Sequence, residues 1–176
     1  MKSLSIHFSI LLLLIAAFGT STIDAAEVLA VSKVQKAPSL PLLVSESVTL
    51  AGELTEAQIS NFNHQTLVID LRTAEEGSQA EAEMLGAANI RYVNIPMSRK
   101  PLNKKTVDQF SKLILDNANS KVLVHCSSGN RAGLLWAAHL INQGTNVDKA
   151  LTLVRPIATK EGTRKAIRLY AEKKND

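Results

Sequence analysis

Cysteine is almost absent from this sequence, because Cys126 is the only one among 176 residues. A disulfide within the chain is therefore excluded, and Cys126 is either a free thiol or a bridge to another molecule. The four histidines, at His7, His64, His125 and His139, do not stand at metal-ligand spacing with it. We accordingly expect no metal site and no cofactor.

Aromatic residues are also scarce, at 4% of the chain, and no run of lysine and arginine interleaved with aromatics occurs. Nucleic-acid binding relies on stacking side chains and a basic stripe, so we expect no nucleic-acid partner. The formal net charge of +4 is only mildly basic. This excess favours an anionic ligand without specifying its chemical class.

Long apolar runs are missing after the N-terminal region, and the run at residues 10–18 is shorter than the roughly 20 residues of a transmembrane helix. Lys2 before the run and small residues after it are typical of a secretory signal peptide. We predict a signal peptide over residues 1–26, cleaved after Ala25 or Ala26, with an uncleaved anchor as the alternative. No cysteine near the cleavage region is available for a lipoprotein anchor. The protein is then expected to be secreted, most simply into a periplasm, without stable membrane insertion after cleavage.

Residues 27–44 contain two prolines and no clear periodicity, so we interpret them as a linker or an irregular lead-in. Residues 45–176 are then one domain, long enough for a core of its own. Apolar runs predict strands at 66–70, 91–96 and 121–125. Helical patterns are found at 54–59, 74–85, 105–118, after 131, at 147–155 and at 162–173. This alternation predicts an α/β fold, with a mostly parallel central sheet and helices on both faces.

The candidate chemistry lies where the strand 121–125 ends, at the edge where open α/β sheets bind ligands. The segment that follows this strand begins with Cys126 and ends with Arg131. The turn between them consists of Ser127, Ser128, Gly129 and Asn130. Its backbone N–H groups can curl around an anion, and the following helix adds the positive end of its dipole. These donors and the Arg131 guanidinium favour the thiolate form of Cys126, and the guanidinium fork fits two oxygens of a phosphate or a sulfur oxyanion.

The stretch HCSSGNRAGLLWA, with LVIDLR and VNIP upstream, resembles the phosphatase-like domains of the bacterial beta-lactamase-hydrolase-like family. These domains are relatives of the cysteine-dependent protein tyrosine and dual-specificity phosphatases. The resemblance extends from about residue 50 to about residue 150, and it implies a three-layer phosphatase-type α/β fold and a phosphocysteine intermediate. By this resemblance Cys126 is the nucleophile, Arg131 the oxyanion clamp and residues 127–130 a substrate-binding backbone cradle. His125, which precedes the nucleophile, is implied to fix the loop by hydrogen bonds and to tune the thiolate.

Three features differ from ordinary tyrosine phosphatases. The interval between Cys126 and Arg131 is one residue shorter, as in the rhodanese loop. Ala132 stands where a serine or threonine often helps the thiolate to leave. The loop MSRKPLNKK at residues 97–105 contains no carboxylate that could protonate a leaving group.

Two further residues are candidates for the site. Asp108, just inside the helix that follows this loop, is the nearest candidate general acid in the sequence, although a first-turn carboxylate also complements a helix dipole. Arg72 follows a parallel strand and therefore ends at the same sheet edge, where it could bind substrate. Its alternative is a salt bridge with Glu75 or Glu76 across one helical turn.

We therefore predict a cysteine-dependent phosphatase-like hydrolase that acts on an anionic, phosphorylated substrate without a metal ion. A rhodanese-like sulfurtransferase, with a persulfide on Cys126, is a second interpretation of the same loop. A third is a non-catalytic module that binds an anionic ligand, which the missing general acid favours. In the non-functional alternative, Cys126 is only a small buried apolar residue and Arg131 points into solvent.

Overall fold

The computed structural model describes residues 41–63, 66–98 and 102–175. The predicted signal peptide and most of the predicted lead-in lie outside the described residues. Within the described part of the chain, every helix is too short or too polar to cross a membrane. All statements on structure below concern these residues.

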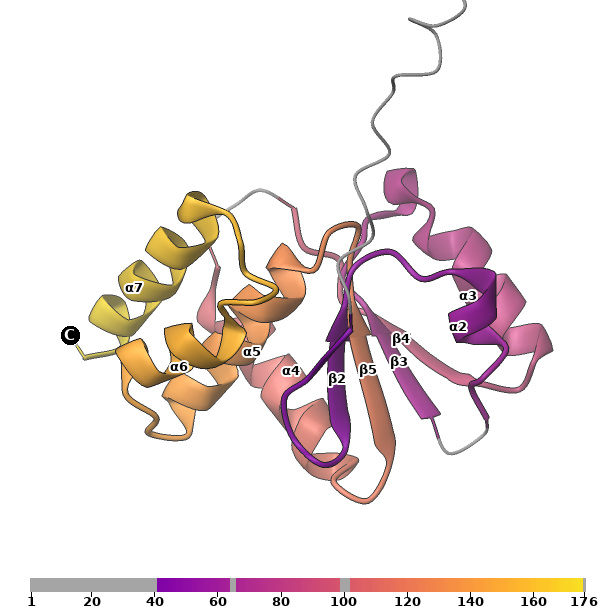
Figure 1. Ribbon diagram of the computed structural model, residues 1–176, viewed down its shortest axis with the longest axis horizontal. Helices are drawn as coiled ribbons and strands as arrows, with labels where there is room; N and C mark the ends of the chain where they lie inside the picture. Colours follow the sequence, from indigo (N-terminus) through magenta and orange to yellow (C-terminus); the bar gives the residue numbers. More distant parts are fainter. Residues whose placement is uncertain (1–40, 64–65, 99–101, 176) are drawn as a thin grey trace, which may run out of the picture. The chain divides into compact units, whose positions relative to one another are not determined.

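A five-stranded sheet organises the described residues, with the strand order β1-β2-β5-β3-β4 (Figure 1). The strands are β1 (Leu42–Leu43), β2 (Val48–Ala51), β3 (Thr66–Asp70), β4 (Arg91–Asn94) and β5 (Lys121–His125). β1 is antiparallel to β2, and the other neighbouring pairs are parallel. The predicted mostly parallel sheet is thus confirmed. β5 and β3 are interior strands, which explains the continuous apolar runs in their sequences.

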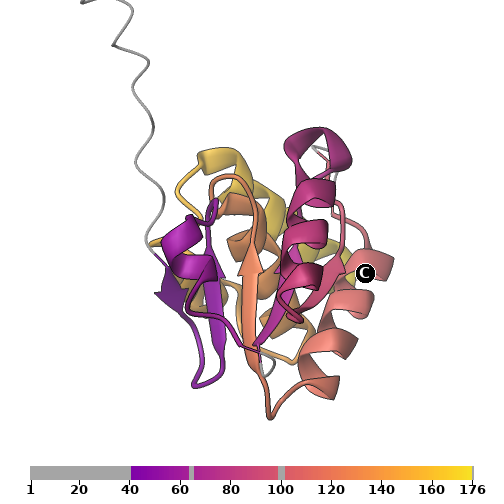
Figure 2. The same ribbon diagram turned by 90° about the vertical axis from the view of Figure 1, so that its right-hand side faces the viewer.

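Helices cover both faces of this sheet, so the predicted three-layer arrangement is also confirmed (Figure 2). One face carries α2 (Glu56–Ile59) and α3 (Ser78–Ala87), and the other carries α4 (Lys104–Asp116) and α5 (Asn130–Asn142). α6 (Val147–Val154) and α7 (Glu161–Asn175) pack against α5. Successive strand residues alternate between two buried apolar clusters: on β5, Val122 and Val124 belong to the α5 side and Leu123 to the α3 side.

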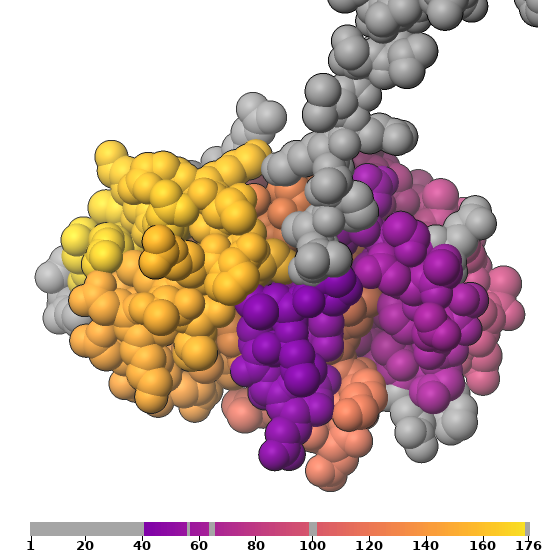
Figure 3. Space-filling view, in the orientation of Figure 1, coloured from indigo at the N-terminus to yellow at the C-terminus, as the bar shows by residue number. Residues whose placement is uncertain are grey.

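The predicted elements are found close to their expected bounds, and two strands are additional. β1 lies inside the segment interpreted as a lead-in, and β2 has only the sequence VTLA. Strands this short carry no alternation long enough to detect. In Figure 3 they form the indigo surface between α6 and α7 on one side and α2 on the other, and Leu43 of β1 is 67% exposed.

The helix predicted over residues 74–85 is divided in two. A 3-10 helix, η1 (Ala74–Glu76), ends at Gly77, and α3 begins at Ser78. Gly77 has a φ of +91°, a left-handed conformation that glycine adopts without the clash of a Cβ atom. Glu76, before this break, pairs with Arg131, and Glu81, after it, pairs with Arg72.

Gly133 on α5 marks a close approach to the segment that follows α6. A Cβ atom on Gly133 would lie 3.0 Å from Ala158 Cβ and 3.1 Å from Ile157 Cγ2. We expect Gly133→Val to lower the free energy of unfolding by about 1 to 3 kcal/mol, because an overpacked contact forces the two segments apart. Urea denaturation measures this change.

Gly86→Ala on α3 is the matched control, since no atom lies within 4 Å of a Cβ placed there. Alanine at this helical position should leave the stability unchanged or raise it by up to about 1 kcal/mol. Equal losses in the two variants would mean that the close approach at Gly133 is unimportant.

Candidate active site

Cys126 directly follows β5 and lies in the order of strand, turn and helix that the sequence predicts. Its side chain is a free thiol, fully buried in the apolar cluster on the α5 side. The turn reverses at Gly129, whose φ of +77° is left-handed, and α5 begins at Asn130. The N-terminus of α5 therefore starts a short turn away from the sulfur, and its dipole favours negative charge there.

Arg131, in the first turn of α5, folds back over the end of the sheet. Its NH1 group donates hydrogen bonds to the carbonyl oxygens of Leu71 and Met97, at 3.1 and 2.8 Å. These carbonyls belong to the segments after β3 and β4. Its NH2 group donates to Ser127 Oγ at 3.1 Å. The guanidinium thus joins three loops at one sheet edge. It does not point freely into solvent.

Cys126 and Glu76 both influence the charge of Arg131. Burial alone would lower the pKa of Arg131, but the hydrogen bond to Glu76 and the nearby Cys126 sulfur outweigh it, so the pKa is raised. The guanidinium is therefore a permanent cation beside the thiol. A cation fixed next to a cysteine favours the thiolate, which is the form that acts as a nucleophile.

Glu76 holds Arg131 in place, although no sequence pattern predicts this role. Its two carboxylate oxygens accept from NH1 and NH2 of Arg131 at 2.7 and 2.6 Å, and one also accepts from Ser127 Oγ at 2.9 Å. The hydrogen bond from Arg131, helped by those from the Thr73 backbone N–H and the Ser127 hydroxyl, lowers the pKa of Glu76 to about 2 despite some burial. Glu76 is therefore ionised near neutral pH and is unsuited to donate a proton there.

Arg72, predicted as a substrate-binding residue, is paired inside the protein. Its side chain is buried on the α3 side, where its Nε and NH2 groups donate to both oxygens of Asp70 at 2.9 to 3.1 Å. NH2 also pairs with Glu81. The alternative salt bridge with Glu75 or Glu76 is not formed, because Arg72 precedes the N-cap of η1, Thr73, and its guanidinium pairs with Asp70 and Glu81.

Asn130 connects the turn to the start of α7. Its Oδ1 accepts from the Lys160 backbone N–H at 2.9 Å and from Thr163 Oγ1 at 3.2 Å. Its Nδ2 donates to the Ser128 carbonyl at 3.4 Å. Asn130 can therefore contribute only backbone to an anion cradle in this conformation, as the resemblance implies, while its side chain supports the turn from behind.

Asp108, the predicted general acid, lies on α4 and is not brought to Cys126 by any contact among the described residues. Its carboxylate pairs with Lys104 at 2.6 Å, and its side chain is 47% exposed. The carboxylate that meets Arg131 is Glu76 instead. A catalytic role for Asp108 stays a prediction.

His125 is fully buried, and its Nε2 atom lies 2.8 Å from Glu81 Oε1 and 3.6 Å from Asp70 Oδ1. These three side chains offer ligand atoms within 4.8 Å of one another, a geometry that could hold a metal ion. Arg72, however, already pairs with both carboxylates. A divalent cation would meet that fixed positive charge, so the arrangement suits an internal ion-pair cluster better than a metal centre.

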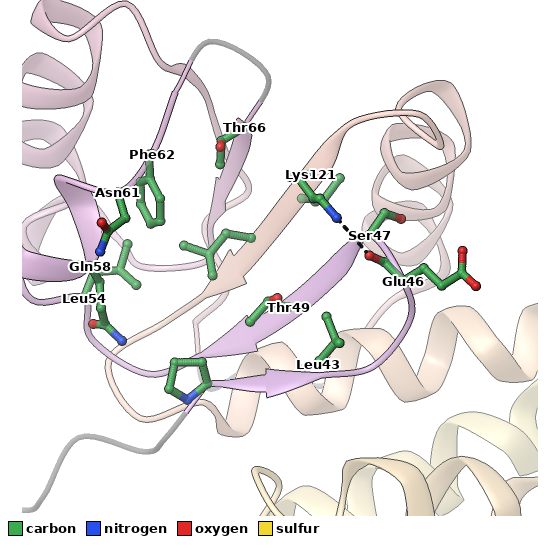
Figure 4. Close-up of a pocket in the computed structure, with 13 residues that line it drawn as sticks. Leu43, Glu46, Ser47, Thr49, Leu54, Gln58, Asn61, Phe62, Thr66 and Lys121 are labelled. Atoms are coloured by element: carbon green, nitrogen blue, oxygen red, sulfur yellow. Dashed lines mark hydrogen bonds between the residues drawn. The ribbon is translucent and has the colours of Figure 1, made fainter.

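A groove of about 340 Å³ lies apart from these residues, beside β1, β2 and α2 (Figure 4). Leu54 and Phe62 form part of its wall, and Lys121 donates to the Glu46 carbonyl at 3.2 Å along it. It contains none of the predicted site residues. The chemistry of Cys126 and Arg131 is therefore independent of this groove.

Comparisons with known proteins agree with this fold. A family model described as "DSP-PTPase phosphatase fused to NAD+ Kinase" matches residues 52–171. Among solved structures, Tk-PTP in the active form is 16% identical, with 75% of this chain and 96% of that chain covered and a TM-score of 0.60. The core catalytic domain of the PP-IP phosphatase SIW14 from S. cerevisiae is 17% identical, with 77% and 92% covered and a TM-score of 0.60. P. aeruginosa TpbA in complex with pTyr is 16% identical, with 77% and 90% covered and a TM-score of 0.58. The search of curated proteins found no match.

The lowered pKa of Glu76 predicts a specific loss of stability in acid. A carboxylate with a folded-state pKa of about 2 and an ordinary value of 4.5 stabilises the fold fully above pH 4.5, and this contribution is lost as the pH falls toward 2. In Glu76→Gln the contribution is absent, so the melting temperature should fall less between pH 6 and pH 3 than in the wild type. Thermal denaturation followed by circular dichroism measures both curves.

Glu53→Gln, a change at an exposed carboxylate in the loop after β2, is the control and should retain the wild-type pH dependence. Glu76→Gln with an unchanged dependence would show that the ion pair with Arg131 adds nothing to stability.

Proposed function

Because this chain belongs to the family of DSP-PTPase phosphatases fused to NAD+ kinase, we propose that it hydrolyses phosphomonoesters with Cys126 as the nucleophile. The observation that carries the proposal is the position of Arg131, a permanent cation fixed beside the only cysteine at the start of a helix. An oxyanion clamp needs this combination of a guanidinium, helix dipole and turn N–H groups.

The reaction would have two steps. The Cys126 thiolate attacks phosphorus, an S–P bond forms, and the P–O bond to the leaving alcohol or phenol breaks. A water molecule then attacks phosphorus, the S–P bond breaks, and inorganic phosphate and the thiolate are released. Arg131 and the backbone of residues 127–130 stabilise the phosphoryl oxygens in both steps. Glu76 keeps the guanidinium oriented.

Proton donation to the leaving group limits the choice of substrate. Glu76 is ionised, and the loop at residues 97–105 contains no carboxylate. We therefore infer that the preferred substrates are those whose leaving group departs readily as an anion, such as aryl phosphates. Phosphotyrosine, the ligand named for the TpbA structure, is an aryl phosphate of this kind.

We also propose that the protein is secreted, and this part of the proposal rests on the sequence alone. The N-terminal pattern of residues 1–26 supports export and a periplasmic location. Membership in the beta-lactamase-hydrolase-like branch of these phosphatases likewise stays a prediction, supported by the motifs HCSSGNRAGLLWA, LVIDLR and VNIP.

Mass spectrometry of the intact protein tests the nucleophile. After brief reaction with 4-nitrophenyl phosphate and an acid quench, we expect a phosphate adduct on the wild-type chain and none on Cys126→Ser. Turnover should persist in a metal chelator. A gain of one sulfur from thiosulfate, with no phosphate adduct, would instead support the sulfurtransferase. Phosphate binding by calorimetry, without any adduct or turnover, would support a non-catalytic module.

Leaving-group dependence tests the absence of a general acid. Since such an acid contributes roughly 10²- to 10⁴-fold, mainly for poor leaving groups, kcat/KM for phenyl phosphate should be at least about 100-fold below that for 4-nitrophenyl phosphate. Similar values for the two esters would contradict this inference. In that case Asp108→Asn, compared with the control Asp116→Asn on the exposed end of α4, would show whether Asp108 supplies the proton.

A further inference from the structure

A second groove is found between α6 and α7, which lie side by side in Figure 1. We call it the helical groove, and its volume is about 360 Å³. Leu151 and Thr152 are its uncharged lining residues. The charged lining residues are Asp148, Arg155, Glu161, Arg164, Lys165 and Arg168. The groove therefore shares no residue with the predicted site around Cys126.

Each helix contributes one face to the helical groove. The lining positions on each helix are three or four residues apart, the spacing at which helical side chains share a face. On α6 this face extends from Asp148 to the C-cap residue Arg155, and on α7 it extends from Glu161 to Arg168. Basic side chains from two packed helices therefore line one cavity.

Two ion pairs neutralise the acidic residues of the helical groove. Arg168 NH1 donates to Asp148 Oδ1 at 2.9 Å and so connects α7 to α6. Arg164 NH2 pairs with Glu161, and Arg164 NH1 donates to the Thr159 carbonyl at 2.7 Å. Each carboxylate thus has a cationic partner, so the negative charge of the groove is already compensated.

Arg155 and Lys165 carry the charge that remains. Both residues are exposed, and within the described part of the chain neither side chain has a hydrogen-bond or ion-pair partner. With four cations against two anions, the helical groove has an excess of two positive charges. Because the two unpaired cations line the same cavity from different helices, both can bind a single anionic ligand.

We propose that the helical groove binds a small molecule with two phosphoryl groups, at a site separate from Cys126. The Arg155 guanidinium can donate two parallel hydrogen bonds to the oxygens of one phosphoryl group. The Lys165 ammonium can act as a point charge for the other. The negative charge of such a ligand complements the positive excess of the groove.

The dimensions of the helical groove favour a small molecule over a protein partner. A volume of about 360 Å³ lies in the range typical of small-molecule pockets. A stable protein partner usually covers roughly 800 Å² on each side, and the core of such an interface is depleted of charged residues. The helical groove is lined mostly by charged residues. An acidic peptide is therefore the less fitting occupant.

Two-dimensional NMR with inorganic pyrophosphate as the probe tests this site on the whole protein. At constant ionic strength, the backbone amides of residues 148–168 should shift with a saturable dependence on pyrophosphate. In Arg155→Gln and in Lys165→Gln, the Kd from these amides should rise at least about fivefold, the effect of one unit-charge contact near 4 Å in water. Because both side chains are exposed and unpaired, both variants should keep the wild-type fold.

Lys173→Gln is the matched control, because it removes the same charge from an exposed position on α7 outside the helical groove. Its Kd should equal the wild-type value. Equal weakening in Lys173→Gln and Lys165→Gln would show only a diffuse attraction to the net charge and would overturn the proposal. The absence of saturable shifts at residues 148–168 would do the same.

A hexaglutamate peptide tests the competing class of ligand. If it shifted the same amides at a lower concentration than pyrophosphate, the groove would be a peptide-docking surface and the proposal would be wrong. Shifts at residues 126–131 report separately on the proposed catalytic turn. A protein without phosphatase activity, but with saturable shifts at residues 148–168 that depend on Lys165, would therefore reject the proposed function and retain this inference.

Discussion

The parallel pairing of β3 with β5 is the constraint on which the whole site depends. It sets Asp70 opposite His125, and the next backbone bond runs from Leu71 N to the His125 carbonyl at 2.9 Å. Both strands leave the sheet at this point. The Leu71 carbonyl can therefore reach Arg131, and the turn begins at Cys126. A slip of one residue would exchange the two faces and bury the charged side chains in the apolar cluster under α5.

Because of this register, the charged side chains and the Cys126 thiol at the strand ends lie on opposite faces of the sheet. Asp70 and His125 point toward α3, where they join Arg72 and Glu81 in an internally paired cluster. Cys126 points toward α5. The sheet edge therefore separates a set of buried charges from a cation that faces the loops.

Local features of the sequence account for the parts that could be predicted. The runs at 66–70 and 121–125 read as strands because both faces of an interior strand are buried, and the turn after Cys126 is recognisable from residues that are neighbours in the chain. The roles of Glu76 and Glu81 could not be predicted in the same way. Glu76 pairs with Arg131, 55 positions along the chain, and such a long-range contact leaves no local pattern in the sequence. Glu81 finds His125 only after α3 has packed on the sheet.

Glu76 illustrates how stability and ligand binding oppose each other at this site. Arg131 is partly buried, and without a carboxylate partner its charge would be costly to keep against three loops. Both of its terminal nitrogens already donate to protein oxygens. An oxyanion must therefore approach the Nε side of the guanidinium or displace Glu76 from one of its two bonds. Displacement would leave the carboxylate close to an incoming anion, which Coulomb repulsion disfavours. The geometry thus favours a ligand bound by the turn N–H groups and the Nε side, with Glu76 kept as the fixed counter-charge that holds Arg131 in place.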